Sequence, residues 1–389
     1  MERGPTGRYQ ISNAGGEEIR AFIPDPLPPQ PPLHFGHRLL NLLERANLAL
    51  GRLDSVGVLL PDPELFLYTY VRREAVLSSQ IEGTQSSLSD LLLFEIAEVP
   101  GIPVDDVVEV CNYVAALEHG IARIREGFPL CNRLIREMHA KLLSSGRGSE
   151  KAPGDFRRTQ NWIGGTRPGN ATFVPPPPEL VPECMAALER FLHEGRGTLP
   201  SAVRAALAHV QFETIHPFLD GNGRLGRLLI AFVLHDEGIL RRPLLYLSLF
   251  FKEHRSDYYR LLDDVRLRGE WEAWLEFFLE GVAHTADNAV YTAQRLVALF
   301  EEDFARLKAS SRGSASTRAV LEALRQRPLL TVPELCRRTG LSFPTVNKSL
   351  KTLEQMGITR EVTTRQRNRV FEYTKHLAIL NEGTEQPAG

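Results

Sequence analysis

His216-Pro217-Phe218-Leu219-Asp220-Gly221-Asn222-Gly223-Arg224-Leu225-Gly226-Arg227 is the segment of this 389-residue chain that says most about its fold. The residues before it carry an apolar series with the 3.6-residue period of a helix, namely Val203, Leu207, Val210, Thr214 and Ile215. Residues Leu228–Leu234, which follow it, are apolar on every side, as in a helix at the centre of a bundle. Helical patterning extends from about His37 to Ala309. We therefore expect an all-α bundle in which this segment joins two central helices.

The glycines and arginines of the segment suit a phosphate ligand. Gly221 and Gly223 let backbone N–H groups approach a ligand closely, and the following helix presents the positive end of its dipole there. Arg224 and Arg227 lie three residues apart, so both guanidinium groups can reach one polyphosphate.

The acid and the histidine of the segment suit chemistry on that phosphate. Asp220 offers carboxylate oxygens, the ligands that Mg²⁺ prefers, and His216 can accept a proton near neutral pH. The same composition also occurs in simple turns, with Asp220 as a helix cap. A base, an acid, glycines and two arginines within one short segment favour a nucleotide site over a turn.

The segment resembles the signature of the Fic family, H-P-F-x-[DE]-G-N-G-R-x-x-R, at every defined position. The resemblance covers about His37 to Ala309. It implies that His216 deprotonates a Ser, Thr or Tyr hydroxyl of a target protein, which then attacks the α-phosphate of ATP and takes up AMP. It also implies that Asp220 holds Mg²⁺. The nucleotide-binding residues that it implies are Asp220, Gly221, Asn222, Gly223, Arg224, Leu225, Gly226 and Arg227.

An upstream pattern, Ser78-Ser79-Gln80-Ile81-Glu82-Gly83, resembles the inhibitory motif of the same family, [ST]-x-x-x-E-[GN]. The resemblance implies an autoinhibited enzyme in which Ser78, Glu82 and Gly83 form the inhibitory site. A Glu82 carboxylate paired with Arg227 would remove the partner of the γ-phosphate. The alternative is an ordinary helix end with Gly83 as its cap.

Two further segments resemble parts of the family site. Thr159–Pro178 contains β-formers, glycines and a proline run, and is similar to the hairpin flap that binds an extended target segment, here through Thr172, Phe173 and Val174. An ordinary surface hairpin is the alternative. Tyr258 and Tyr259 resemble the residues beside the adenine ring, although paired aromatics in a helix are more often part of a core.

The C-terminal part of the chain differs from the rest in charge. Residues 317–375 hold twelve Lys or Arg against five Glu, an excess of seven positive charges in a chain whose net charge is −2. Thr331 begins a helix, Gly340 makes a turn, a second helix runs from about Phe343 to Met356, and Ile358–Val362 can pair with Val370–Tyr373. The pattern resembles a winged helix-turn-helix, which implies DNA as a partner. The alternative is a module for protein contacts or dimerisation.

These observations predict an extended Pro-rich arm over residues 1–36 and a helical region with the inhibitory helix over residues 37–100. They predict a catalytic domain over residues 101–309, a linker over residues 310–316, and a winged helix with a C-terminal tail over residues 317–389. The four scattered cysteines, the lack of a signal peptide at the N-terminus and the short apolar runs predict a cytoplasmic protein without a membrane partner.

The predicted function is therefore a Mg-ATP-dependent protein adenylyltransferase, restrained by Glu82 and acting on other proteins or on itself. Two alternatives stay open. The chain could be a DNA-binding regulator that uses the Fic domain as a nucleotide sensor, or it could remove AMP from modified targets. A homodimer is plausible from the family.

Overall fold

The computed structural model describes residues 3–14, 17–59, 63–96, 104–194, 196–310, 313–363 and 369–384. The chain divides into two compact units. The first unit comprises Met1–Ser55, Leu77–Thr84 and Val108–Asp287, and the second comprises Val56–Val76, Gln85–Val107 and Asn288–Gly389.

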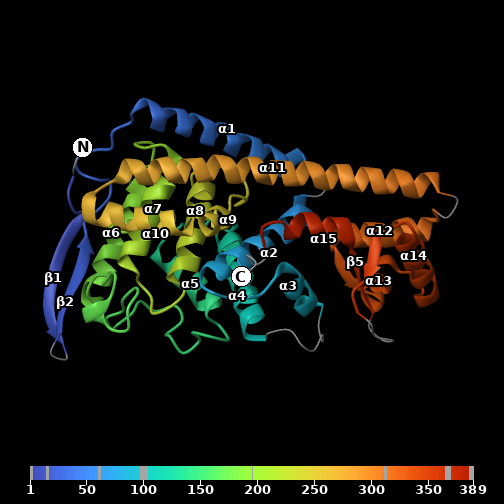
Figure 1. Cartoon of the computed structure of the whole chain (residues 1–389), viewed down its shortest axis with the longest axis horizontal. Coiled ribbons are helices and arrows are strands. Elements are labelled where there is room, and N and C mark those ends of the chain that lie inside the picture. Colours follow the sequence, from blue (N-terminus) through green and yellow to red (C-terminus); the bar gives the residue numbers. More distant parts are fainter. Residues whose placement is uncertain are drawn as a thin grey trace. The chain divides into compact units, whose positions relative to one another are not determined.

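The first unit is a helical bundle built around α7 (Ser201–Ile215) and α8 (Asn222–Asp236), which pack against each other (Figure 1). Residues Ala202–Ile215 and Arg224–Leu234 are buried, because both helices lie at the centre of the bundle and most of their residues are apolar. The other helices with residues in this unit are α1 (His37–Leu59), the end of α2 (Pro63–Ile81), α4 (Val104–Arg125), α5 (Asn132–Leu142), α6 (Val181–Glu194), α9 (Ser248–Glu253), α10 (Arg255–Arg268) and the start of α11 (Trp271–Ala309). Two short 3₁₀ helices span Pro168–Asn170 and Pro178–Leu180.

The N-terminal segment differs from the expected extended arm. Strands β1 (Gly7–Ala14) and β2 (Glu17–Pro24) pair antiparallel, with Gly7 opposite Pro24. The Phe22 N–H donates to the Val174 carbonyl (2.9 Å), so this hairpin is attached to the segment predicted as the flap. Regular structure then stops over the Pro-rich residues until α1 begins.

The predicted flap, Thr159–Pro178, is less regular than a hairpin. The structure describes all of these residues, and their only strand-like pairing is an isolated bridge between Ile163 and Phe173. The prolines at 175–178 cannot donate to a strand ladder, which explains why the pairing stops there. The two-stranded sheet of the first unit is therefore β1–β2.

The second unit contains the first part of α2, α3 (Leu88–Glu95), the end of α11 and a winged helix-turn-helix. The winged helix consists of α12 (Ala315–Gln326), β3 (Leu329–Thr331), α13 (Val332–Thr339), α14 (Phe343–Gln355), β4 (Thr359–Glu361), β5 (Val370–Tyr373) and α15 (Thr374–Asn381). Its strands form one antiparallel sheet in the order β3–β5–β4. Gly340 makes the turn between α13 and α14 at a φ of 69°. The sequence between β4 and β5 includes Arg365 and Arg367, which the pattern predicts at the tip of the wing and which lie outside the described residues.

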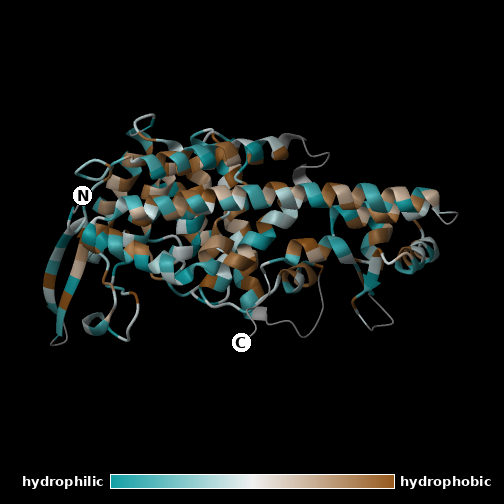
Figure 2. Cartoon of the chain, turned by 45° about the horizontal axis from the view of Figure 1, so that its top comes forward, coloured by the Kyte–Doolittle hydropathy of each residue, from teal (hydrophilic) through white to brown (hydrophobic). Residues whose placement is uncertain are grey.

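Helix α11 contributes residues to both units and is 39 residues long. Figure 2 shows hydrophobic and hydrophilic residues interleaved along it, as expected of a helix with an apolar face. In the second unit, Tyr373 donates a hydrogen bond to Asp303 of α11 (2.9 Å) and packs near Phe300. The end of α11 is thus part of the packing of the winged helix. Among the residues that the structure describes, no helix combines the length and apolar composition of a bilayer-spanning segment.

Candidate active site

The segment quoted first folds into a short loop between α7 and α8. His216 ends α7 at a φ of 49°, in the left-handed region that non-glycine residues rarely occupy. Gly221, at a φ of 76°, precedes α8. The Asn222 side chain closes the loop, because it accepts from the Phe218 N–H (2.9 Å) and donates to the Phe218 carbonyl (2.8 Å). His216 and the free N–H groups at the start of α8 therefore lie at the two ends of one braced loop.

The His216 ring is neutral at physiological pH. Its Nδ1 is buried and has no hydrogen-bond partner within the described part of the chain. Burial, together with the charges of Arg157 and Arg266, lowers the pKa of His216 to about 4. A neutral imidazole has one nitrogen that can accept a proton, so this side chain can act as a base at pH 7.

Two residues that the sequence analysis did not single out hold the loop of His216. The buried Arg157 side chain donates from Nε to the His216 carbonyl (2.9 Å) and from Nη2 to the Pro176 carbonyl (2.5 Å). Asn161 donates to the Phe218 carbonyl (2.9 Å). Both residues therefore tie the loop to the predicted flap. Nothing in the sequence distinguishes Arg157 from the exposed arginine that follows it.

His139 on α5 is a third residue that the sequence analysis missed. Its ring stacks on Phe218, with centroids 3.7 Å apart and planes 10° apart. Its Nδ1 accepts the Gly154 N–H (2.8 Å), so Nε2 carries the proton and donates to the Asp220 carbonyl (3.0 Å). Burial lowers the pKa of His139 to about 4, which keeps this ring neutral as well. His139 thus supports the backbone at Asp220.

The Asp220 carboxylate lies at the edge of the site, with 35 % of the side chain exposed. Its Oδ1 accepts the Gly221 N–H (2.5 Å). Gly148 in the loop after α5 lies close to this carboxylate, since a Cβ there would be 2.7 Å from Oδ2, and its φ of 85° favours glycine at this position. Among the described residues, no group of three or more His, Cys, Asp or Glu is placed to hold a metal ion.

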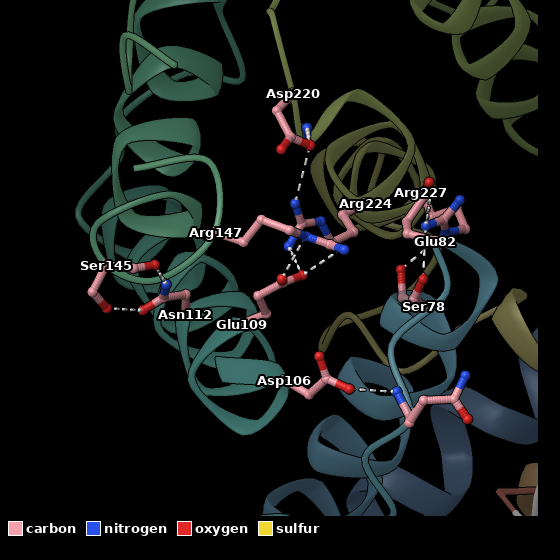
Figure 3. A network of polar contacts seen from close by, with 12 residues as sticks. Ser78, Glu82, Asp106, Glu109, Asn112, Ser145, Arg147, Asp220, Arg224 and Arg227 are labelled. Carbon is pink, nitrogen blue, oxygen red and sulfur yellow. Dashed lines mark hydrogen bonds and ion pairs between the residues drawn. The ribbon is translucent and has the colours of Figure 1, made fainter. Parts of the chain in front are cut away.

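The two arginines of the segment contact carboxylates from different helices (Figure 3). Arg224, whose side chain is 1 % exposed, lies 3.1 Å from Glu109 of α4 and 3.4 Å from Asp220. Arg227, whose side chain is 2 % exposed, lies 2.7 Å from Glu82 at the end of α2. Each buried guanidinium therefore has a carboxylate beside it, as buried charges require.

The sequence-predicted inhibitory residues meet Arg227. Ser78 accepts from Arg227 through both its side-chain hydroxyl and its carbonyl, each at 2.9 Å. The Glu82 carboxylate contacts the position that a Cβ on Gly223 would occupy, so it lies in the gap that the absent side chain leaves at the start of α8. A carboxylate therefore lies at the helix N-terminus, where an anionic ligand is favoured.

Charge pairing keeps Glu82 ionised. Burial acts to raise the pKa of Glu82, but the Arg227 guanidinium outweighs it and holds the pKa below the usual range. Gly83 follows at a φ of 100°, which a residue with a side chain adopts only with strain. The chain can therefore turn away directly after Glu82.

The remaining motif residues belong to the packing behind the loop. Leu225 is buried in the core. Gly226 lies against the Glu213 carboxylate, which would overlap with a Cβ at this position. Gly226 thus allows α8 to approach α7 closely.

The two tyrosines predicted beside adenine differ in position. Tyr258 is 1 % exposed and stacks on Phe251, and its hydroxyl lies 2.8 Å from His209 Nε2. Tyr259 is 39 % exposed, with Arg255 over its ring. Tyr258 is thus a core residue with a partner for its hydroxyl, whereas Tyr259 is partly exposed to solvent.

The three predicted flap residues also differ in exposure. Phe173 and Val174 are 8 % and 7 % exposed. Phe173 lies beside Phe22 of β2, and Val174 packs with Ile19 and Ala21 of the same strand. Thr172 is exposed. The N-terminal hairpin therefore covers two of these residues and leaves Thr172 accessible.

Three family models match the chain. Residues 40–122 match the Fic/DOC family N-terminal model, residues 129–234 match the Fic/DOC family model, and residues 314–358 match a winged helix-turn-helix DNA-binding model.

Curated relatives carry the name protein adenylyltransferase Fic. The relative from Culex quinquefasciatus is 30% identical over 268 residues, which cover 68% of this chain and 50% of the relative. The relative from Drosophila melanogaster is 30% identical over 219 residues, which cover 56% of this chain and 41% of the relative. The chain therefore spans about half the length of these relatives or less.

Solved structures share the fold. A Fic family protein from Desulfovibrio desulfuricans superposes with a TM-score of 0.56 at 22% identity, covering 89% of this chain and 98% of that one. Residues 134–508 of Fic-1 from C. elegans superpose with a TM-score of 0.51 at 22% identity, covering 66% and 73%.

Proposed function

Because the chain carries Fic N-terminal and Fic domains followed by a winged helix-turn-helix, we propose that it is a protein adenylyltransferase. It transfers AMP from ATP to a Ser, Thr or Tyr hydroxyl of a target protein or of itself. The observation that carries the proposal is the juxtaposition of a neutral His216 with the N-terminus of α8, where Arg224 and Arg227 lie within the first turns.

Each of these groups has one role in the reaction: base, phosphate binding, or charge neutralisation. His216 accepts the proton of the target hydroxyl, and the oxygen forms a bond to the α-phosphorus of ATP. The bond from that phosphorus to the bridging oxygen breaks, and pyrophosphate leaves with the electron pair. Gly221, Gly223 and the first N–H groups of α8 bind phosphate oxygens, and the arginines neutralise the leaving group.

Asp220 is the residue that would hold Mg²⁺. Its carboxylate is partly exposed beside the phosphate-binding helix end, and it is a hard oxygen ligand. A single protein carboxylate fits Mg²⁺, which commonly takes its remaining ligands from phosphates and water. When bound, the ion would offset the negative charge of the phosphates.

Glu82 restrains the reaction while its carboxylate is paired with Arg227. Its carboxylate pairs with Arg227 and lies over Gly223, the space that a γ-phosphate would need. ATP in its productive position has to displace it. Tyr259 supplies the open aromatic face for adenine, and Thr172 is the exposed flap residue for a target segment.

Labelled ATP tests the proposal directly. The Glu82→Gly chain, incubated with a cell lysate, should attach label from α-labelled ATP to polypeptides and none from γ-labelled ATP. Mass spectrometry of the labelled bands should show the mass of AMP on a hydroxyl residue. Transfer of the γ-label, or no transfer at all, would contradict the proposal. Release of AMP from a pre-labelled target by the wild type would identify the reverse activity.

The winged helix supports DNA as a second partner. Lys348 and Lys351 of α14 are exposed on the helix that corresponds to the reader of the major groove. We expect the full-length chain to bind duplex DNA with an affinity that falls steeply with salt. Reversing both lysines to Glu should weaken binding roughly tenfold or more and lower the salt slope by about two.

A filter-binding titration at several salt concentrations measures this. Arg190→Glu, an exposed charge reversal on α6, is the matched control. If neither the wild type nor the control is retained on DNA at low salt, the winged helix is a protein-contact module instead. A homodimer and a cytoplasmic location stay predictions from the sequence.

A further inference from the structure

Glu109 on α4 is a buried carboxylate that serves two arginines (Figure 3). Its side chain is 2 % exposed. It accepts from Arg224 Nη1 (3.1 Å), from Arg147 Nε (2.8 Å) and from Arg147 Nη2 (3.2 Å). A carboxylate at this depth requires such partners, because an unpaired buried charge is strongly unfavourable.

Arg224 lies between two carboxylates. Its Nη1 contacts Glu109, and its Nη2 lies 3.4 Å from Asp220. Its Nε has no hydrogen-bond partner within the described residues. Since the side chain is almost fully buried, its charge has to be balanced by one of these two acids.

Arg147 comes from the loop after α5, and its neighbour Gly148 lies against Asp220. The Arg147 side chain is 56 % exposed, so only its tip is bound by Glu109. Glu109 thus contacts the guanidinium groups of both Arg147 and Arg224, close to Asp220. The two guanidinium groups thus meet two carboxylates, Glu109 and Asp220, so removing either acid leaves a positive charge without its partner.

We propose that Glu109 is a positioning residue for nucleotide binding, which balances the charge of Arg224 and keeps this arginine from pairing fully with Asp220. The inference rests on the roles of Arg224 and Asp220 in the proposed function. Without the Glu109 carboxylate, Asp220 is the nearest acid for Arg224. The pair that would then form withdraws Asp220 from the metal and Arg224 from the phosphates.

Glu109→Gln, which keeps the size and removes the charge, tests this in the Glu82→Gly chain. Calorimetric titration should show Mg-ATP affinity reduced roughly tenfold, the size expected of one charge-assisted contact. The affinity for AMP, which lacks the β- and γ-phosphates, should change less than about twofold, and more Mg²⁺ should be needed for ATP to bind. Glu137→Gln is the matched control, because Glu137 also pairs with two arginines, Arg123 and Arg133, elsewhere on the surface.

Three outcomes would overturn the inference. They are an unchanged Mg-ATP affinity, an unchanged Mg²⁺ requirement, and an equal loss of AMP and ATP binding, which would make Glu109 a general brace. If Glu109→Gln does not fold, Glu109→Asp retains the charge with a shorter reach and should shift the Mg²⁺ requirement in the same direction by less. An equal loss of AMP and Mg-ATP binding in that variant would also overturn it. Label transfer by the Glu82→Gly chain tests the adenylyltransferase proposal separately, because these titrations do not depend on transfer.

Discussion

His216→Ala should reduce AMP transfer by about 10²–10⁴-fold, the loss expected when a general base is removed. Folding and ATP binding should stay close to wild type. The contacts that brace the loop end on backbone atoms, since Arg157 donates to the carbonyl of His216. The rate of transfer from α-labelled ATP in the Glu82→Gly background measures the loss, and calorimetry measures ATP binding. Undiminished labelling by a folded variant would rule out the mechanism.

The pH profile gives an independent check on the same residue. Because burial, Arg157 and Arg266 lower the pKa of His216 to about 4, the ring stays neutral well below its ordinary pKa. Loss of the base through protonation should therefore occur near pH 4 and leave the rate level around pH 6.5. Between about pH 6.5 and pH 4, His216 is protonated in the unfolded chain but not in the folded chain. Its contribution therefore lowers the free energy of unfolding as the pH drops through this range. A loss of rate centred at pH 6.5 would mean that the ring is more exposed to solvent during catalysis.

Glu82→Gly should raise AMP transfer by about 10- to 100-fold over the wild type. The carboxylate and the γ-phosphate compete for one buried guanidinium, and a charge-assisted hydrogen bond is worth this factor. Helix α2 should keep its place, because Glu82 lies beyond its end. Arg227 keeps its two hydrogen bonds to Ser78 but loses its counter-charge, so the variant should be less stable than the wild type in the absence of ATP. Initial rates of self-labelling and target labelling, measured at Mg-ATP concentrations below saturation, give the increase. Equal rates for the two proteins would reduce Glu82 to a helix-end residue.

Arg227 supplies the control for this release. Arg227→Ala removes both the restraint and the partner of the γ-phosphate, so it should not raise the rate. The double variant should be as poor as Arg227→Ala alone, because the effects of groups that act as a unit do not add. A double variant as active as Glu82→Gly would show that the restraint does not act through Arg227.

Much of the site could be expected from the sequence, because its residues are contiguous. The loop from His216 to Arg227 and the partner residues Ser78 and Glu82 come together in the structure, as the two motifs had suggested. The contact between Glu82 and Arg227 could be expected only from the family resemblance, because the two residues are far apart in the sequence and composition gives no sign that they meet.

The residues that were missed have no local pattern. Glu109 lies three residues after Asp106 on the same helix, and only the fold shows that its side chain is buried beside two arginines. His139 and Arg157 resemble surface residues in the sequence for the same reason. For Tyr258 the local pattern fitted both a ligand pocket and a core, and the structure places this residue in the core.

The N-terminal hairpin could have been found. Residues 17–24 contain the strand formers Ile19, Phe22 and Ile23, and two glycines that suit a turn precede them. The proline run that follows indicates an extended arm, which is correct for residues after Pro24 but not for the two strands before it. The consequence reaches the site, because β2 buries Phe173 and Val174 and so limits which flap residues can meet a target.

The backbone at His216 has a practical consequence for trapping target complexes. A left-handed φ costs a residue with a Cβ about 1–2 kcal/mol, a cost that glycine avoids and asparagine tolerates better. The fold thus keeps a histidine where the main chain alone would favour glycine. An inactive bait made with His216→Gly or His216→Asn relieves this strain, whereas His216→Ala keeps the strain and loses the ring. The glycine or asparagine variant is therefore the better bait for testing whether the chain captures target proteins, as the proposed function expects.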